Sequence, residues 1–307
     1  MTTVPTFLVA GGARCGTTGL VEGLRLHPRV FVTQPKEPHY FALHRSGAHF
    51  TAPGDEHTIN RVAVTDRDAY LALYPDRHDY LALGEGSVST LYYAEDALPE
   101  VLRVNPAMKL VVLLRDPVER AYSAHQYMRA RGLEPVEDFL DAVALEDERR
   151  EAGWHHIWHY TAMSRYAGSL ATLQAALPAE QLGVWFYDDL NTDYEGTLDS
   201  VLAFLGVPLD SQRSITAPRV NISGRPRFRT VNAALQWATA NAAVRTTVKR
   251  TTTYHFRERV RRAVIRGSDL PPGVREELAP LFAEDLQRLQ AQLPGSDLPA
   301  WLTAVPR

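Results

Sequence analysis

Cysteine is almost absent from this chain: Cys15 is the only one among 307 residues. A single cysteine cannot form an intrachain disulfide, which excludes the small secreted domains that depend on such bonds. The first ten residues contain only a brief apolar run and no cationic segment, which is too little for a signal peptide or a membrane span. These features predict a cytoplasmic protein with no membrane span.

A strong charge of either sign is also lacking, since the formal net charge is −3. A nucleic-acid-binding surface would need a clear basic excess, so no nucleic-acid partner is expected. The chain contains no internal repeat, low-complexity tract or obvious linker. With 45% hydrophobic residues it can bury a large core, and we expect one domain over residues 1–307.

Short apolar runs alternate with helical patterns along the chain. Strands are expected at residues 6–10, 30–33, 108–114 and 182–187, and helices over 17–26, about 117–132, around 198–205 and about 273–293. We assign the last helix to core packing without chemistry. The alternation predicts an α/β fold with a central parallel sheet that carries helices on both faces.

A glycine-rich turn, G-G-A-R-C-G-T-T, follows the first expected strand at residues 11–18. A helix N-terminus after a strand presents free N–H groups and a positive dipole end to an anion. The spacing from Gly11 to Gly16 is that of a P-loop, but Thr17 stands where nucleoside triphosphatases have lysine. Arg14 supplies a cation inside this P-loop-like turn instead. The alternative is an ordinary glycine turn.

A second anion site is suggested by R-D-P-V-E-R-A-Y-S at residues 115–123. Arg115 ends the strongest expected strand, and Ser123 lies two turns into the next helix. A guanidinium and a hydroxyl can hold a phosphate monoester together. The alternatives are an ion pair of Arg115 with Asp116 or Glu119 and an ordinary helix serine at position 123.

These segments resemble the sulfotransferases that use 3′-phosphoadenosine 5′-phosphosulfate (PAPS), especially the heparan sulfate and bacterial branch. Q-P-K-E-P-H-Y-F at residues 34–41 is similar to the segment that carries the catalytic glutamate of that branch. The likeness extends through S-R-Y-A-G (164–168), F-Y-D-D-L (186–190), V-L-A-F-L-G-V (201–207) and D-L-P-A-W (297–301). It thins at residues 42–80 and 229–268, which we interpret as variable insertions on the acceptor side.

The resemblance implies roles for individual residues. The 5′-phosphosulfate would be bound by the loop residues Ala13, Arg14, Cys15, Gly16, Thr17 and Thr18. The 3′-phosphate would be bound by Arg115 and Ser123, and Arg225 matches a loop that closes over the nucleotide. The family's loop lysine is replaced by Arg14 here, and its second lysine falls on Gly86, next to Glu85.

Transfer of a sulfuryl group needs a base for the acceptor and cations for the developing charge, by analogy with phosphoryl transfer. The resemblance marks Glu37 as the base, with His39 as the rival because imidazole titrates near neutrality. Lys36 can tune Glu37 or contact the sulfuryl oxygens, and Arg14 can stabilise the leaving oxygen. No cluster with metal-ligand spacing is seen, so no metal is expected.

Two other functions stay open at this point: an ATP-dependent small-molecule kinase with an altered P-loop, and a non-catalytic nucleotide-binding module. The acceptor is a hydroxyl or amine of a small molecule, lipid or glycan. The aromatic and histidine-rich residues 154–160 suit stacking on a ring or plain packing. The basic residues at 245–266 suit a solvated helical face, a lip over an anionic ligand or weak membrane contact.

Overall fold

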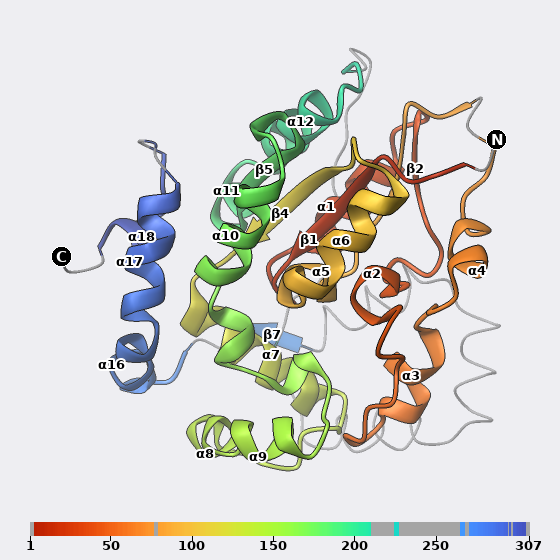
Figure 1. Ribbon diagram of the computed structural model, residues 1–307. Helices are drawn as coiled ribbons and strands as arrows, with labels where there is room; N and C mark the ends of the chain where they lie inside the picture. The colour runs from red at the N-terminus through yellow and green to blue at the C-terminus, as the bar shows by residue number, and fades with distance from the viewer. Residues whose placement is uncertain are drawn as a thin grey trace.

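In the computed structural model, the described residues are 3–76, 79–209, 270–293, 295 and 297–304, together with the backbone of two short strands at 224–226 and 265–267. A five-stranded parallel sheet in the order β2-β3-β1-β4-β5 lies at the centre (Figure 1). Its strands are β1 (Phe7–Gly11), β2 (Val30–Val32), β3 (Ala82–Glu85), β4 (Lys109–Leu114) and β5 (Leu182–Phe186).

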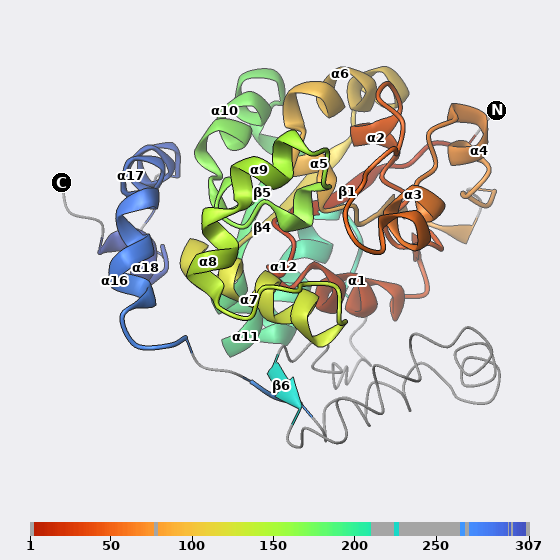
Figure 2. The same ribbon diagram turned by 90° about the horizontal axis from the view of Figure 1, so that it is seen from below.

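Helices cover both faces of this sheet, as the sequence predicts. Alternate residues of β1 enter different cores: Phe7 and Val9 pack with α1 (Thr17–Arg25) and α12 (Tyr194–Leu205). Leu8 and Ala10 pack on the other face with α6 (Ala94–Val104) and α10 (Ala167–Ala176). Figure 2 shows the sheet edge-on between these two helix layers.

Further helices surround the sheet. Those in the described residues are α2 (Tyr40–Leu43), α3 (Ile59–Val62), α4 (Arg67–Leu71), α5 (Ser89–Tyr92), α7 (Pro117–Ala130), α8 (Phe139–Ala144), α9 (Glu146–Glu151), α11 (Tyr187–Thr192), α16 (Val274–Leu278), α17 (Ala283–Gln292) and α18 (Ala300–Thr303). Single 3₁₀ turns lie at Asp55–His57, His156–Trp158, Ala162–Ser164, Ala179–Gln181 and Ala279–Phe282. The strands β6 (Gly224–Pro226) and β7 (Ile265–Gly267) pair antiparallel in a separate ribbon.

Strands β1 and β4 end almost level with each other, whereas β3 ends three residues earlier along β1. In the register of the sheet, Gly11 of β1 lies beside Leu113 of β4, and Leu8 lies beside Glu85 of β3. The turn after β1 and the residues after β4 therefore emerge at one edge, where ligands of open α/β sheets bind. This is the edge that the two candidate anion sites require.

Strand β3 was not predicted from the sequence. Its four residues, A-L-G-E, include a glycine and a carboxylate, which are poor strand formers. Gly84 is needed because a Cβ there would lie 2.4 Å from the carbonyl oxygen of Phe7 on β1. Close packing between the backbones of β1 and β3, rather than strand propensity, therefore selects this residue.

The prediction of one closing helix over about 273–293 is wrong. The segment divides into α16, a 3₁₀ turn at Ala279–Phe282 and α17. Pro280 stands in that turn, where its missing N–H and its ring are incompatible with a continuous helix. The expectation of core packing is confirmed, since Val274, Leu278 and Phe282 lie in one core cluster and Leu289 in another. Arg275 of α16 also pairs with Asp116 and Glu119.

The structure describes only part of two regions that the sequence analysis singled out, the two expected insertions. Residues 42–76, in the first expected insertion, contain α3, α4 and a 3₁₀ turn. The basic residues of 245–266, except for the backbone at 265–266, and most of 229–268 lie outside the described residues. Within the described ranges, no helix is long and apolar enough to cross a membrane.

Candidate functional site

The loop between β1 and α1 has an unusual backbone. Gly16 precedes α1 with a φ of 92°, and Arg14 has a φ of 78°. Left-handed geometry at a non-glycine residue costs about 1–3 kcal/mol and persists only where surrounding contacts impose it. At Gly16 a Cβ would also lie 2.8 Å from Leu190. The loop is thus held in one shape at the N-terminus of α1.

The two candidate anion sites are in direct contact. Arg14 Nε donates a hydrogen bond to Ser123 Oγ at 3.3 Å, although 109 residues separate them. Arg115 Nη1 donates to the carbonyl oxygen of Arg14, also at 3.3 Å. Both candidate anion sites therefore lie at the same edge of the sheet and touch each other.

Arg115 is also part of an ion-pair chain. Its Nη2 lies 3.1 Å from Glu119, and its guanidinium stacks on the ring of Tyr187 at 4.3 Å. Arg275 reaches Glu119 at 3.3 Å and Asp116 at 2.7 Å. Glu119 also pairs with Arg275, so its negative charge is divided between two arginines. Arg115 can therefore bind an anionic ligand as well.

Two loop residues turn their side chains into the core. Cys15 is fully buried, with Sγ 3.8 Å from the Tyr166 hydroxyl, and Ala13 is buried too. Burial raises the pKa of the Cys15 thiol more than the nearby Arg120 lowers it, so the thiol stays protonated. Cys15 and Ala13 can meet a ligand only through the backbone.

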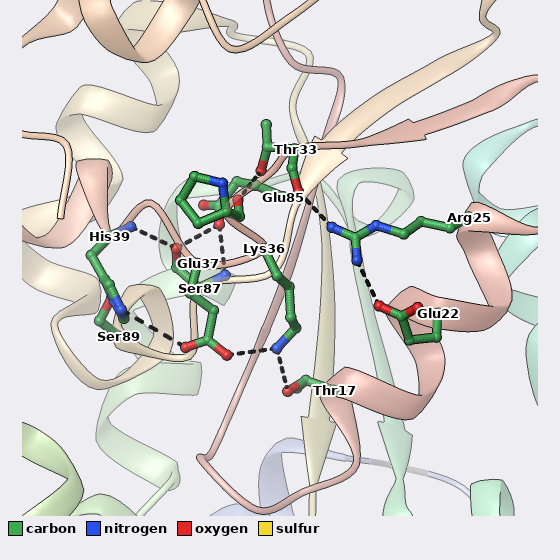
Figure 3. A network of polar contacts seen from close by, with 11 residues as sticks. Thr17, Glu22, Arg25, Thr33, Lys36, Glu37, His39, Glu85, Ser87 and Ser89 are labelled. Carbon is green, nitrogen blue, oxygen red and sulfur yellow. Dashed lines mark hydrogen bonds and ion pairs between the residues drawn. The ribbon is translucent and has the colours of Figure 1, made fainter. Parts of the chain in front are cut away.

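Lys36 joins the loop to Glu37, as Figure 3 shows. Its ammonium donates to Thr17 Oγ1 at 3.1 Å and to Glu37 Oε1 at 2.7 Å. Burial by itself would raise the pKa of Glu37, but Lys36 and His39 outweigh it and hold this pKa below its usual value. Glu37 is therefore a carboxylate at neutral pH, and its side chain is 30% exposed.

His39 holds the other side of Glu37. Its Nε2 lies 3.9 Å from Glu37 Oε2, and its Nδ1 lies 2.8 Å from Ser89 Oγ (Figure 3). The backbone N–H of His39 donates to Ser87 Oγ, which fixes the left-handed φ of 57°. Burial lowers the pKa of His39 to about 4, so the imidazole is neutral and suited to orienting Glu37.

The side chain of Lys36 lies over Gly86, the position at which the family's second lysine is absent here. A Cβ on Gly86 would lie 2.9 Å from Lys36 Cε, so the lysine side chain crosses directly over this glycine. Neighbouring Glu85 is fully buried and accepts hydrogen bonds from Ser87. Burial raises the pKa of Glu85 to about 7.

Sequence reasoning missed Arg120. This residue of α7 is completely buried and donates to Ser164 Oγ, to the Tyr160 carbonyl and, at 3.3 Å, to the Ala13 carbonyl of the loop. In the sequence it looks like any arginine on a helix. Its spacing of five residues from Arg115 gave no signal that it turns inward.

A cluster of rings lies beside His39, which we call the ring cluster: His39, Tyr92, Tyr93, His156 and His159. The centroid of His156 is 5.8 Å from that of His39 and 5.6 Å from that of Tyr93. The Tyr92 hydroxyl lies 2.8 Å from His159 Nδ1. Part of the 154–160 patch thus reaches the site from a distant segment.

The rest of that patch is packing. Trp154 and Trp158 lie against the guanidinium of Arg149, which pairs with buried Glu134 at 2.8 Å. The Tyr160 hydroxyl donates to the same Glu134 at 2.6 Å. These residues support the ring cluster instead of belonging to it.

The structure says little about two further predictions, the role of Arg225 and the expectation that no metal is bound. Arg225 lies in β6 opposite Arg266, and β6 runs beside α7, but its side chain is outside the described part of the chain. No group of three or more histidine, cysteine, aspartate or glutamate side chains in the described residues could hold a metal ion.

Comparison with known proteins gives consistent results. A crystal structure of a sulfotransferase from Alicyclobacillus acidocaldarius is 27% identical, with a TM-score of 0.73, and the match covers 97% of this chain and 99% of that one. Mouse carbohydrate sulfotransferase 15 is 31% identical over 174 residues, which is 46% of this chain and 30% of the relative. Human bifunctional heparan sulfate N-deacetylase/N-sulfotransferase 2 is 24% identical, over 66% of this chain and 22% of its own length. The chain thus matches less than a third of these curated relatives.

The family model described as the sulfotransferase family matches residues 5–211. That range is well over half of the chain, and it contains the loop, the segment from Lys36 to His39 and the pair of Arg115 with Ser123. The chain with these contacts therefore belongs to the sulfotransferase family.

Proposed function

We propose that this chain transfers a sulfuryl group from PAPS to a hydroxyl or amine of an acceptor, and that one domain over residues 1–307 carries the reaction. The observation that carries the proposal is the contact of Arg14 with Ser123 and of Arg115 with the loop. PAPS is an anion at two ends, the 5′-phosphosulfate and the 3′-phosphate, and two adjoining anion sites match that distribution of charge. A cytoplasmic location stays a prediction.

In this proposal the loop binds the 5′-phosphosulfate. Arg14, Thr17 and Thr18 contribute side chains, whereas Ala13, Cys15 and Gly16 contribute backbone N–H groups at the start of α1. Arg115 and Ser123 bind the 3′-phosphate, and Arg225 closes over the nucleotide. The buried side chain of Cys15 supports the assignment of a backbone role.

Glu37 is the proposed base for the acceptor. Its carboxylate is paired with Lys36, which keeps its pKa low and its basicity weak. A bound sulfuryl group beside Thr17 would attract the Lys36 ammonium, because that ammonium already bonds Thr17 Oγ1. Losing its cation raises the pKa of Glu37, so the base becomes effective when the donor is in place.

His39 orients this base and does not replace it. Because the pKa of His39 is lowered to about 4, its imidazole no longer titrates near neutrality, which was the reason to consider it as the base. Its side chain is 8% exposed, compared with 30% for Glu37, which leaves the carboxylate better placed to reach an acceptor.

For the acceptor we propose a carbohydrate. The curated relatives are named for carbohydrate and heparan sulfate substrates. The ring of His156 lies next to His39, and the rings of Tyr92 and Tyr93 lie against His156. Aromatic faces suit the C–H faces of a sugar. Small aryl molecules and lipids are the alternatives that an acceptor screen has to include.

Calorimetry with adenosine 3′,5′-bisphosphate, and separately with ATP and magnesium, tests the cofactor. We expect binding of the bisphosphate and none of ATP, since Thr17 replaces the lysine that the β- and γ-phosphates need. A kinase would reverse this preference. Labelled PAPS with a panel of sugars, phenols and lipids then tests turnover, and binding without transfer to any acceptor would indicate a non-catalytic nucleotide-binding module.

A further inference from the structure

Arg120 carries a buried charge that has no acidic hydrogen-bond partner among the described residues. Its guanidinium donates to two carbonyl oxygens, of Ala13 and Tyr160, and to the Ser164 hydroxyl. The acid that acts on it electrostatically is Glu146, whose carboxylate accepts hydrogen bonds from the backbone N–H groups of Thr161 and Ala162. An arginine does not lose its proton, so this charge remains in the core.

A buried cation without a counter-ion is unfavourable unless another group compensates it. The neighbouring Cys15 and Tyr166 do not, because burial raises the pKa of both and keeps them neutral. The loop that would receive the donor's phosphosulfate is in direct contact with Arg120 through the Ala13 carbonyl. A buried positive charge therefore lies beneath this candidate anion site.

The contact with Ala13 also fixes a peptide plane. The C=O and N–H of a trans peptide point in opposite directions, so a carbonyl directed at Arg120 turns the N–H of Arg14 away from α7. The next carbonyl, that of Arg14, is held by Arg115. Two guanidiniums thus hold two successive carbonyls of the loop, and the N–H of the first peptide points to the side opposite Arg120.

We propose that Arg120 is a positioning residue for the 5′-phosphate of the donor. It fixes the Ala13–Arg14 peptide so that the Arg14 N–H faces the phosphate, and it supplies a positive charge from the α7 side of the loop. The inference rests on the proposed function, since it assumes that the loop binds this phosphate.

The test compares two ligands that differ only in the 5′-phosphate: adenosine 3′,5′-bisphosphate and adenosine 3′-phosphate. In Arg120→Gln, which removes the charge, we expect bisphosphate affinity to fall on the order of tenfold further than affinity for the monophosphate. Arg120→Lys keeps the charge and should retain most of the preference. A purely structural role would weaken both ligands equally in both variants, which would overturn the proposal.

Ser164→Ala is the matched control for packing. It removes one buried partner of Arg120 but leaves the charge and the Ala13 contact, so the ratio of the two affinities should equal that of the wild type. A ratio that falls as far as in Arg120→Gln would contradict the proposal, because loosened packing alone would then explain the effect.

A measurement on the unaltered chain covers the case in which Arg120→Gln does not fold. In amide NMR spectra, the bisphosphate should move the Arg14 N–H strongly downfield, as hydrogen bonding to phosphate does, and adenosine 3′-phosphate should not. An Arg14 resonance that responds equally to both ligands would overturn the inference. If the wild type bound neither ligand, the proposed function itself would fail, and that outcome is distinct from loss of the Arg120 effect alone.

Discussion

The proposed donor side and the proposed acceptor side of the site are built from different chemistry. The donor side, formed by the loop and the start of α7, concentrates the guanidiniums of Arg14, Arg115 and Arg120 around one turn. The acceptor side is the ring cluster beside Glu37. Its phenols stay protonated and its imidazoles neutral, because burial raises the pKa of Tyr92 and Tyr93 and lowers that of His39, His156 and His159.

This difference separates two tasks. A charged donor needs fixed cations. An uncharged acceptor ring needs aromatic faces and neutral hydrogen-bonding groups, which do not attract the anionic donor. Lys36 and Glu37 lie at the boundary and connect the two sides through Thr17. Substitutions on either side should therefore affect different kinetic constants.

Among substitutions at the boundary between the two sides, Glu37→Gln should have the largest effect. Without a base, turnover should fall by about 10²–10⁴-fold, the usual contribution of general base catalysis. Affinity for adenosine 3′,5′-bisphosphate should stay within about twofold, since the loop is unchanged. Labelled donor measures the first quantity and calorimetry the second. Wild-type turnover in this variant would move the role of base to His39 or elsewhere.

Lys36→Ala should lower turnover by roughly 10²-fold, since it removes a cation from the developing charge. It should also alter the pH profile of kcat/KM. In the wild type the carboxylate is lost as pH falls through a pKa held below the usual value; without Lys36, burial raises that pKa, so the acidic limb moves to higher pH. A profile whose acidic limb stays in place would show that Lys36 does not act through Glu37.

Arg115→Ala sharpens the assignment within the donor side. A charged hydrogen bond contributes about 1.5–3 kcal/mol, so affinity for adenosine 3′,5′-bisphosphate should fall about tenfold or more. Affinity for adenosine 5′-phosphate, which lacks the 3′-phosphate, should change little. Equal losses for the two ligands in calorimetry would remove Arg115 from the 3′-phosphate site.

Tyr92→Phe is the mildest test and addresses the acceptor side. It removes the hydroxyl contact with His159 while keeping the ring, and a neutral hydrogen bond contributes about 1 kcal/mol. The acceptor KM should rise about fivefold, with the donor KM unchanged. A change confined to the donor KM would contradict the division into two sides.

Several parts of the site could be predicted because they follow from local rules. A glycine turn between a strand and a helix, and an arginine at the end of a central strand, lie at the binding edge of any parallel sheet. The contact of Arg14 with Ser123 is a consequence of β1 lying beside β4. Neither required knowledge of the remaining chain.

Other parts could not be predicted. The role of Gly86 depends on a lysine 50 residues earlier that crosses it, and a lysine in a proline-bracketed loop can point in many directions. The inward turn of Arg120 depends on acceptors at Ala13, Tyr160 and Ser164, which three different elements bring together.

The amino-acid sequence by itself determined the parallel α/β architecture and the glycine-rich turn at its binding edge, because periodicity and turn chemistry act over a few residues, whereas Glu37 was proposed from the family resemblance. Tertiary structure alone decided that Lys36 bridges Thr17 and Glu37, that Arg120 lies beneath the loop and that His156 meets His39. These contacts join residues far apart in the chain, and their formation depends on strand order and helix packing that no local pattern encodes.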